Sequence, residues 1–333
     1  MILIAIKQKE IFGIYLKKMI RKAAIISISG PVLTKKEATI IRNEKPWGII
    51  LFKRNIMSEI QLINLTRNIK KIMKDKNYPI LIDEEGGRVS RFSNFLDNTM
   101  FPQKYFGDIY RLNKNIGIKL YKLYLNTLSN TLIKVGVNIN TSPVLDLIKK
   151  NTHKVIGNRS YSTNSSIVNE LGTLCINFYK KNKIGTVIKH IPGHGGATSD
   201  SHFSLPKIND TFQVLKKNDF KCFKNKSSFF AMTAHILYTR IDKNNNATHS
   251  SIILKKIIRN EIGFKGILIS DDISMKALKY DIVKNARLAI KAGCNLILYC
   301  AGKTSEIKKL MKEIPYIDKF TTKKTSEFYK FLS

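Results

Sequence analysis

Short apolar runs that alternate with longer helix-like segments constrain the fold of this chain more than any other feature. The runs are rich in Ile, Val, Leu and Phe, and eight of them recur, at 23–29, 48–52, 78–83, 137–147, 185–190, 228–235, 266–272 and 295–300. Segments between them place apolar residues at helical spacing, as at 58–75, 116–136, 165–181, 250–263 and 283–293. This alternation predicts a parallel sheet that helices cover on both faces.

Two α/β architectures fit this pattern, an open doubly wound sheet and a closed barrel. Eight strands in 333 residues favour the barrel, which needs roughly 250 residues plus loops. No linker rich in Pro, Gly or Ser divides the chain. We therefore expect an α/β protein with a single-domain (β/α)8 barrel of the TIM type over residues 20–333.

Residues 1–19 are an N-terminal extension of undecided status. Their apolar residues are interrupted by Lys7, Lys9 and Glu10, too early for the uninterrupted core of a secretory signal. Met19 stands just before the first strand-like run and marks an alternative translation start. The extension is thus either an amphipathic addition or absent from the mature protein.

The charge of the chain is extreme but evenly distributed. Lys and Arg number 58 against 24 Asp and Glu, a formal net charge of +34. The excess forms no single arm or patch and no RNA-binding motif, so composition alone explains it and we expect no nucleic acid as a partner. No run of about 18 apolar residues predicts a membrane span, and we expect no membrane partner and a monomer.

The cysteines indicate a reducing compartment. None of the four forms a CxxC pair or a zinc-finger spacing with His. We expect reduced, buried thiols and a cytoplasmic protein. The four are Cys175, Cys222, Cys294 and Cys300.

Titratable residues collect where the predicted strands end, at Asp83, Asp146, His190, His235 and Asp271. In a barrel these ends converge on one face, where active sites lie. A cap at the N-terminus of the following helix would explain any one of these residues by itself. Five together indicate a site.

The segment 189–202, KHIPGHGGATSDSH, carries three of the six histidines. His190 and His194 have the spacing of a metal site, but Pro192, Gly193, Gly195 and Gly196 oppose a regular helix, so only a loop could gather a metal from the three imidazoles. The glycines match no phosphate-binding motif. Asp200 and His202 are two residues apart, so a carboxylate can orient an imidazole for proton transfer. A plain polar turn explains these two residues equally well.

Two further segments carry chemistry that suits a sugar. In 266–278, GILISDDISMKAL, Asp271 ends an apolar strand and can attack an electrophilic carbon. A nucleophile with a separate proton donor is the minimum for retaining glycoside hydrolysis. In 82–92, IDEEGGRVSRF, Asp83, Arg88 and Arg91 flank paired glycines and can bind hydroxyl or carboxylate groups. Alone this second segment is only a charged turn.

Seven motifs then occur in a fixed order: LFKRN, IDEEGGRVSRF, SPVLDL, IGNRSY, KHIPGHGGATSDSH, MTAHILY and GFKGILISDDISM. The series resembles the bacterial β-N-acetylglucosaminidases of glycoside hydrolase family 3 that act in peptidoglycan recycling. The resemblance runs from about Gly30 to Leu298. The combination of KHxPGHG, DSH and SDD is highly specific for this family.

The resemblance implies a role for each matching residue. Asp271 matches the nucleophile, and His202 matches the acid/base, paired with Asp200. No metal and no cofactor is implied. The positions that match substrate-binding residues are Asp83, Arg91, Arg159, Lys189 and His190.

The implied activity is a retaining, exo-acting β-N-acetylglucosaminidase on N-acetylglucosaminyl-1,6-anhydro-N-acetylmuramic acid and its peptide-bearing forms. Alternatives are a β-glucosidase or glycoside phosphorylase on the same scaffold, and a non-catalytic muropeptide or nucleic-acid binder. Only about thirty residues follow Cys300. These are too few for the second domain that supplies an acid in many family members, which agrees with His202. This tail is also shorter than is usual for the family, so the sequence does not predict whether it forms a final helix or how that helix packs.

Overall fold

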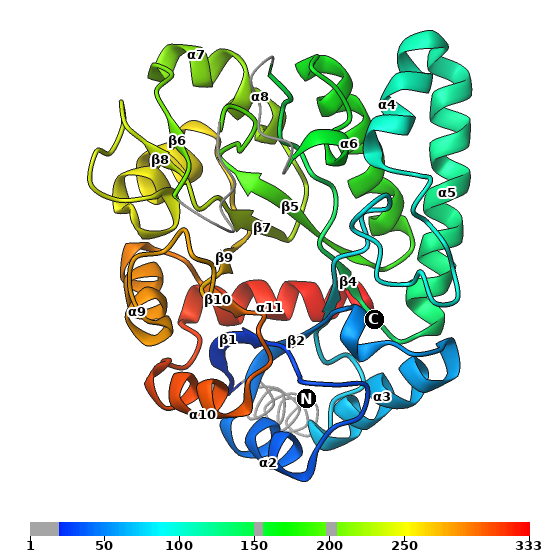
Figure 1. Ribbon diagram of the computed structural model, residues 1–333, viewed down its shortest axis with the longest axis vertical. Coiled ribbons are helices and arrows are strands. Elements are labelled where there is room, and N and C mark those ends of the chain that lie inside the picture. Colours follow the sequence, from blue (N-terminus) through cyan, green and yellow to red (C-terminus); the bar gives the residue numbers. More distant parts are fainter. Residues whose placement is uncertain (1–19, 150–155, 198–204) are drawn as a thin grey trace, which may run out of the picture.

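Eight parallel strands close into a barrel in a computed structural model that describes residues 20–149, 156–197 and 205–333 (Figure 1). The last strand pairs with the first, Ala24 lying opposite Ile297, so this sheet has no free edge. Each predicted apolar run overlaps one barrel strand, and the predicted (β/α)8 fold is confirmed. The strands are β1 (Lys22–Ile26), β2 (Pro46–Leu51), β3 (Ile80–Ile82), β4 (Ile139–Asn140), β5 (Gly185–Ile191), β7 (Phe230–Thr233), β9 (Ile267–Asp272) and β10 (Leu296–Tyr299).

The strands are apolar along their whole length because both of their faces are covered. All residues of β2 and of β5 are buried, although side chains alternate between the barrel interior and the helical layer. A strand with one wet face would alternate apolar and polar residues instead. The continuous runs in the sequence therefore follow from the closed, helix-covered sheet.

Helices surround the barrel, and each of the five predicted helical segments overlaps one. Side-chain caps start several of them: Thr34 and Glu37 form a capping box, and Ser58 and Asp281 cap α3 and α9. The helices are α2 (Lys35–Glu44), α3 (Glu59–Ile72), α4 (Gln103–Leu112), α5 (Lys114–Lys134), α6 (Ser165–Lys181), α7 (Phe212–Lys217), α8 (Asp219–Phe223), η4 (Ile253–Glu261, a π-helix), α9 (Ile282–Ala292), α10 (Thr304–Glu313) and α11 (Lys319–Leu332), with short 3-10 turns η1 (Lys53–Asn55), η2 (Gly157–Arg159) and η3 (Ala247–His249).

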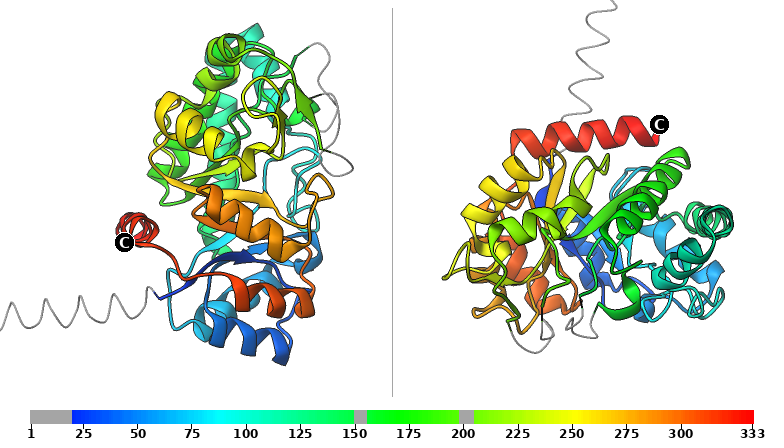
Figure 2. Two further views of the ribbon diagram at one scale, coloured as in Figure 1. Left: turned by 90° about the vertical axis from the view of Figure 1, so that its left-hand side faces the viewer. Right: turned by 90° about the horizontal axis from the view of Figure 1, so that it is seen from above.

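The C-terminal tail folds into α10 and α11, which answers the question that the sequence left open. Helix α11 lies across one end of the barrel (Figure 2). Its Phe328 ring packs 5.0 Å, centroid to centroid, from Phe230 at the start of β7. The Trp47 indole N–H, at the start of β2, donates to Thr325 Oγ1 at 2.9 Å. The tail thus closes the N-terminal end of the barrel and leaves the opposite end for a site.

A second, two-stranded sheet lies outside the barrel. It consists of β6 (Lys207–Ile208) and β8 (Leu237–Tyr238), which pair in parallel. Both strands lie outside the eight predicted apolar runs, and the sequence does not predict them. Within the described ranges no helix combines the length and apolarity needed to cross a bilayer.

Candidate active site

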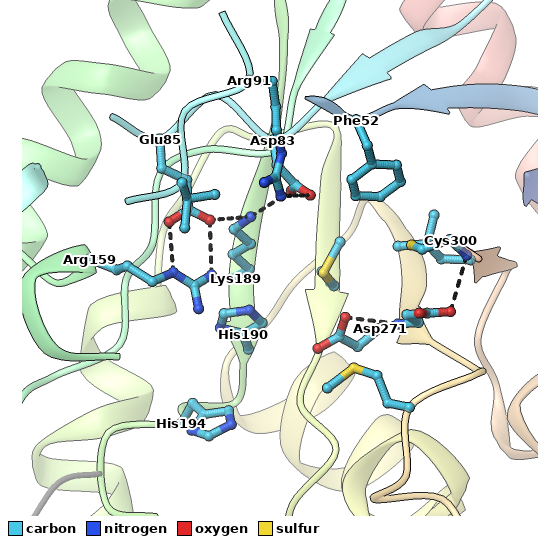
Figure 3. A pocket seen from close by; sticks show the side chains of 15 residues that line it. Phe52, Asp83, Glu85, Arg91, Arg159, Lys189, His190, His194, Asp271 and Cys300 are labelled. Atoms are coloured by element: carbon cyan, nitrogen blue, oxygen red, sulfur yellow. Dashed lines mark hydrogen bonds and ion pairs between the residues drawn. The ribbon is translucent and has the colours of Figure 1, made fainter. Parts of the chain in front are cut away.

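A pocket opens where the barrel strands end at their carboxyl termini (Figure 3). Its wall includes side chains that follow β2, β3, β5, β9 and β10. This is the convergence that the strand-end residues predict. Six of the predicted site residues line the pocket, namely Asp83, Arg91, Arg159, Lys189, His190 and Asp271. The other two, Asp200 and His202, lie outside the described residues.

A glycine turn after β3 brings Arg91 back toward Asp83. Gly86 has a φ of +84°, and a Cβ there would stand 2.3 Å from the Phe101 carbonyl oxygen, so only glycine fits. Glu84 then accepts the backbone N–H of Arg91 at 2.6 Å. The result is that Arg91 Nη2 lies 3.4 Å from Asp83 Oδ2.

Four charged side chains form a continuous chain of ion pairs on one wall of the pocket. Lys189 Nζ lies 2.9 Å from Asp83 Oδ1 and 2.5 Å from Glu85 Oε1. Arg159 forks onto Glu85, with Nε 2.8 Å from Oε2 and Nη2 2.9 Å from Oε1. Burial opposes ionisation of Glu85, but Arg159 and Lys189 outweigh it and lower its pKa to about 2. The same balance, with Lys189 and Arg91 as cations, lowers the pKa of Asp83.

Asp146 fixes the orientation of His190. Its buried carboxylate accepts from His190 Nδ1 at 2.7 Å and from the His194 backbone N–H at 2.7 Å. Burial raises the pKa of Asp146, but the His190 contact prevails and the net shift is downward. A proton on Nδ1 leaves Nε2 of a neutral His190 as a hydrogen-bond acceptor, so this residue suits a substrate hydroxyl.

His194 also lines the pocket. Its ring lies 5.6 Å from the His190 ring, centroid to centroid. Burial, followed by the neighbouring His190, lowers the pKa of His194 to about 4. The ring is therefore neutral at pH 7, and it contributes shape and polarity rather than charge.

Asp271 stands on the other wall, at the end of β9, across the pocket from Glu85 and Arg159 (Figure 3). Its Oδ1 accepts the backbone N–H of Asp272 at 2.8 Å. Burial raises the pKa of Asp271, but His235 and His190 lower it by more. The net shift is downward, so Asp271 is an anion. Among the described residues no Lys or Arg forms an ion pair with it.

The neighbouring carboxylate, Asp272, is committed to local structure. Its Oδ1 accepts the backbone N–H of Cys300 at 3.1 Å, and its Oδ2 accepts the Ser274 hydroxyl at 2.7 Å. Burial raises its pKa. Of the two adjacent aspartates, Asp271 is therefore the one that is available to a substrate.

His235, the remaining strand-end residue, is buried behind Asp271 rather than exposed in the pocket. Its Nε2 lies 3.0 Å from the Asp272 carbonyl oxygen and its Nδ1 lies 2.8 Å from Thr248 Oγ1. Burial lowers its pKa. A neutral ring thus donates to the strand end that carries Asp271.

Sequence reasoning missed Glu85, which joins Arg159 to Lys189. One signal was available: in an extended chain, residues 83 and 85 point to the same side. It also missed Phe52, whose ring lies 5.3 Å from the Arg91 guanidinium and forms part of the wall. In the described ranges no group of three or more His, Cys, Asp or Glu side chains could hold a metal ion.

The fold and the pocket define a (β/α)8-barrel enzyme with an available carboxylate facing a polar, charge-paired wall. A family model, the glycosyl hydrolase family 3 N terminal domain, matches residues 18–322. The chain belongs to this family. It is a glycoside hydrolase of the beta-hexosaminidase type.

Individual relatives agree with this assignment. The chain is 32% identical to the beta-hexosaminidase of Nitrosomonas eutropha over 83% of its own length and 80% of that protein. It is 34% identical to that of Neisseria gonorrhoeae over 80% of its length and 75% of the relative. The crystal structure of NagZ from Neisseria gonorrhoeae in complex with N-trifluoroacetyl-D-glucosamine is similar too, with a TM-score of 0.84, 29% identity, and coverage of 93% of this chain and 90% of that one.

Proposed function

We propose that the protein is a retaining exo-β-N-acetylglucosaminidase that removes terminal N-acetylglucosamine from N-acetylglucosaminyl-1,6-anhydro-N-acetylmuramic acid and its peptide-bearing forms. The observation that carries the proposal is the pocket itself. An ionised Asp271 without a cationic partner among the described residues faces a wall on which polar groups are already fixed. The group that reacts with the sugar and the groups that bind it are therefore different residues.

In the first step, Asp271 attacks the anomeric carbon of the bound sugar. The glycosidic bond breaks, and the leaving oxygen takes a proton from the imidazolium of His202, which Asp200 orients. The product of this step is a glycosyl ester on Asp271. His202 and Asp200 enter on the motif alone, since they lie outside the described residues.

In the second step, neutral His202 takes a proton from water while the water oxygen attacks the anomeric carbon. The bond to Asp271 breaks, and the carboxylate and the imidazolium return to their starting states. Two inversions at the same carbon give net retention. No metal or redox group is required by this sequence of proton and carbon transfers.

The opposite wall holds the sugar through groups of fixed polarity. Asp83 is an acceptor for hydroxyl donors, Arg91 and Lys189 are donors, and His190 presents an acceptor. Because each is paired before the substrate arrives, little ordering remains for the moment of binding. Arg159, held by Glu85, supplies positive charge at the same wall, which suits a substrate with a carboxylate.

The proposed compartment is the cytoplasm, where muropeptides of this kind are recycled. Support comes from the cysteines, because Cys175, Cys222, Cys294 and Cys300 are all free thiols. Free thiols are typical of a reducing compartment.

Purified full-length protein tests the activity directly. We expect turnover of a nitrophenyl N-acetyl-β-glucosaminide well above that of the matching β-glucoside, with no stimulation by phosphate, and release of N-acetylglucosamine from the anhydro disaccharide. A preference for the glucoside, or sugar phosphate as the product, would replace the proposal with the corresponding alternative.

Two variants test the roles. We expect His202→Ala to lose most activity on the disaccharide and less on an aryl glycoside, whose leaving group needs little protonation. Asp271→Ala should be inactive on both substrates. A His202→Ala enzyme equally impaired on both substrates would remove the acid/base assignment but leave the activity standing.

A further inference from the structure

Exposed apolar side chains gather on the hairpin formed by α4 and α5. Four of them form a stripe at its tip: Leu112, Ile116, Leu120 and Leu123 are 82%, 51%, 37% and 64% exposed. The last three are spaced four and three residues apart, which places them on one face of α5. Other exposed apolar residues of this region are Met100, Phe101, Tyr105 and Ile133.

Helix α5 is apolar on two opposite faces. Its inner face, with Tyr121, Leu125, Leu128 and Leu132, is buried against the rest of the protein. Its outer face carries the exposed stripe, and the helix itself lies at the edge of the molecule (Figures 1 and 2). A surface helix normally pairs one apolar face with one polar face. An outer apolar stripe therefore indicates something that covers it.

The charged side chains of helix α5 itself have a single sign. Helix α5 contains lysines at 114, 119, 122 and 134 and no acidic residue. Lys114 and Lys134 form ion pairs with Glu170 and Glu59 on neighbouring helices. Lys119 and Lys122 are exposed between and beside the apolar residues, and no acid in the described residues pairs with them. Arg111 adds a further exposed cation next to Leu112.

We propose that the stripe and the flanking cations Arg111, Lys119 and Lys122, together called the hairpin surface, dock the protein on an anionic phospholipid surface. Aliphatic side chains at helical spacing can enter the boundary between headgroups and acyl chains. Lysines beside them meet the lipid phosphates. The protein would lie on the membrane, since no described helix can cross one.

Two other occupants fit the hairpin surface less well. A second copy in a two-fold dimer would set these lysines against their own counterparts, in a chain whose net charge is +34. A nucleic acid would use the lysines, but it gains little from Leu and Ile, because bases stack on aromatic or guanidinium groups. An anionic lipid surface uses both the aliphatic and the cationic parts.

The sequence alone predicts no membrane partner, because residues 116–136 resemble any amphipathic helix until their inner face is known. Once the inner face is known to be buried, the exposed apolar residues on the outer face are seen to have no role in packing α5 against the barrel. This inference is independent of the activity proposed above, and the experiment below measures binding without a substrate.

Sedimentation with lipid vesicles tests the hairpin surface in the full-length protein. We expect binding to vesicles of phosphatidylcholine mixed with phosphatidylglycerol, little binding to phosphatidylcholine alone, and weaker binding as salt rises. Leu120→Glu with Leu123→Glu should weaken binding at least about tenfold, because it removes apolar insertion and adds repulsion. Thermal unfolding checks that the variant is folded.

Matched controls separate this site from general attraction by a basic protein. Val32→Glu with Ile60→Glu makes the same charge change at exposed apolar sites, 67% and 72% exposed, and should leave affinity within about twofold. Lys119→Gln with Lys122→Gln should weaken binding more than the same change at exposed lysines elsewhere, such as Lys35 and Lys36 on α2.

Four results would overturn the proposal. The first is no binding of the folded wild type to anionic vesicles. The second is equal loss in the hairpin and control variants, which would assign binding to net charge alone. The third is a wild-type dimer that Leu120→Glu with Leu123→Glu converts to a monomer. The fourth is binding of RNA, rather than vesicles, that depends on the hairpin surface.

Discussion

The two walls of the pocket are built in opposite ways. On the paired wall, Asp83, Glu85, Arg159 and Lys189 neutralise one another before any substrate arrives. On the open wall, Asp271 receives a backbone N–H and no ion pair from the described residues. Ion pairs hold groups still, whereas a nucleophile needs its charge for the substrate. The difference indicates that recognition is fixed in advance and that reactivity is kept for the sugar.

The open wall gives the largest expected effect. Asp271→Asn removes the nucleophile, and we expect kcat to fall on the order of 10⁴-fold, with little change in thermal stability. Steady-state kinetics and thermal unfolding measure the two quantities. Asp272→Asn is the matched control, because it makes the same change one residue away on a carboxylate that binds Ser274 and Cys300. Similar losses of kcat without loss of stability in both variants would contradict the distinction.

The paired wall predicts the reverse pattern for Glu85→Gln. This change leaves Lys189 and Arg159 buried without their shared anion, and breaking such a pair costs about 3 to 5 kcal/mol. We expect a large fall in the free energy of unfolding and a rise in KM that exceeds the fall in kcat. Denaturant unfolding and steady-state kinetics measure these effects.

Glu84→Gln provides the control for that prediction. Glu84 accepts backbone N–H groups of Arg91 and Phe92 and forms no ion pair in the described part of the chain. A glutamine oxygen can accept both backbone bonds, and only the 3.3 Å bond from Asn98 Nδ2 to the other oxygen is lost, so we expect a loss of about 1 kcal/mol. If Glu84→Gln proved as harmful as Glu85→Gln, charge pairing would not be what distinguishes the paired wall.

Stability should depend on pH through His194. Its pKa is lowered from 6.5 to about 4. Between these two pH values the unfolded chain binds a proton at this residue and the folded chain does not. The free energy of unfolding should therefore decrease as pH falls from 6.5 to about 4, by about 3 kcal/mol at most. Burial lowers the pKa of His249 to about 4 as well, so His194→Gln should reduce the slope of this part of the profile without removing it. An unchanged slope would show that the ring is protonated in the folded protein.

Glu85 should add a second, more acidic loss of stability. Its folded pKa is about 2 against an ordinary 4.5, so its contribution is present above 4.5 and is lost as pH falls through 2. Glu85→Gln should show a smaller loss in this interval, because Asp83 and Asp271, whose pKa values are also lowered, still contribute. Unfolding measured at several pH values separates this window from that of His194.

At the closed end of the barrel we expect a modest effect on stability and none on catalysis. Thr325→Val removes the acceptor of the buried Trp47 indole N–H, which costs about 1 to 2 kcal/mol. KM and kcat should not change, because neither residue lines the pocket. A rise in KM comparable with that of Glu85→Gln would mean that α11 communicates with the site.

The sequence predicts the barrel well because its signal is local and repeated. Continuous apolar runs identify all eight barrel strands, and the polar residues after them identify the face of the site. Contacts between distant residues are harder to predict. The packing of α11 on β2 and β7, the role of Glu85 between Arg159 and Lys189, and the apolar outer face of α5 all depend on which residues the fold brings together. The pair β6 and β8 is missed because, unlike the two-residue strand β4, neither strand lies within a longer predicted apolar run.

The measurement that tests the central claim most directly is covalent trapping of the nucleophile. A 5-fluoro N-acetylglucosaminyl fluoride forms the glycosyl ester and slows its hydrolysis, and mass spectrometry locates the added sugar after trypsin digestion. We predict one sugar on the peptide Gly266–Lys276, at Asp271 rather than Asp272, and none on Asp271→Asn. Inactivation with the sugar on another residue, or full turnover without any adduct, would contradict the account.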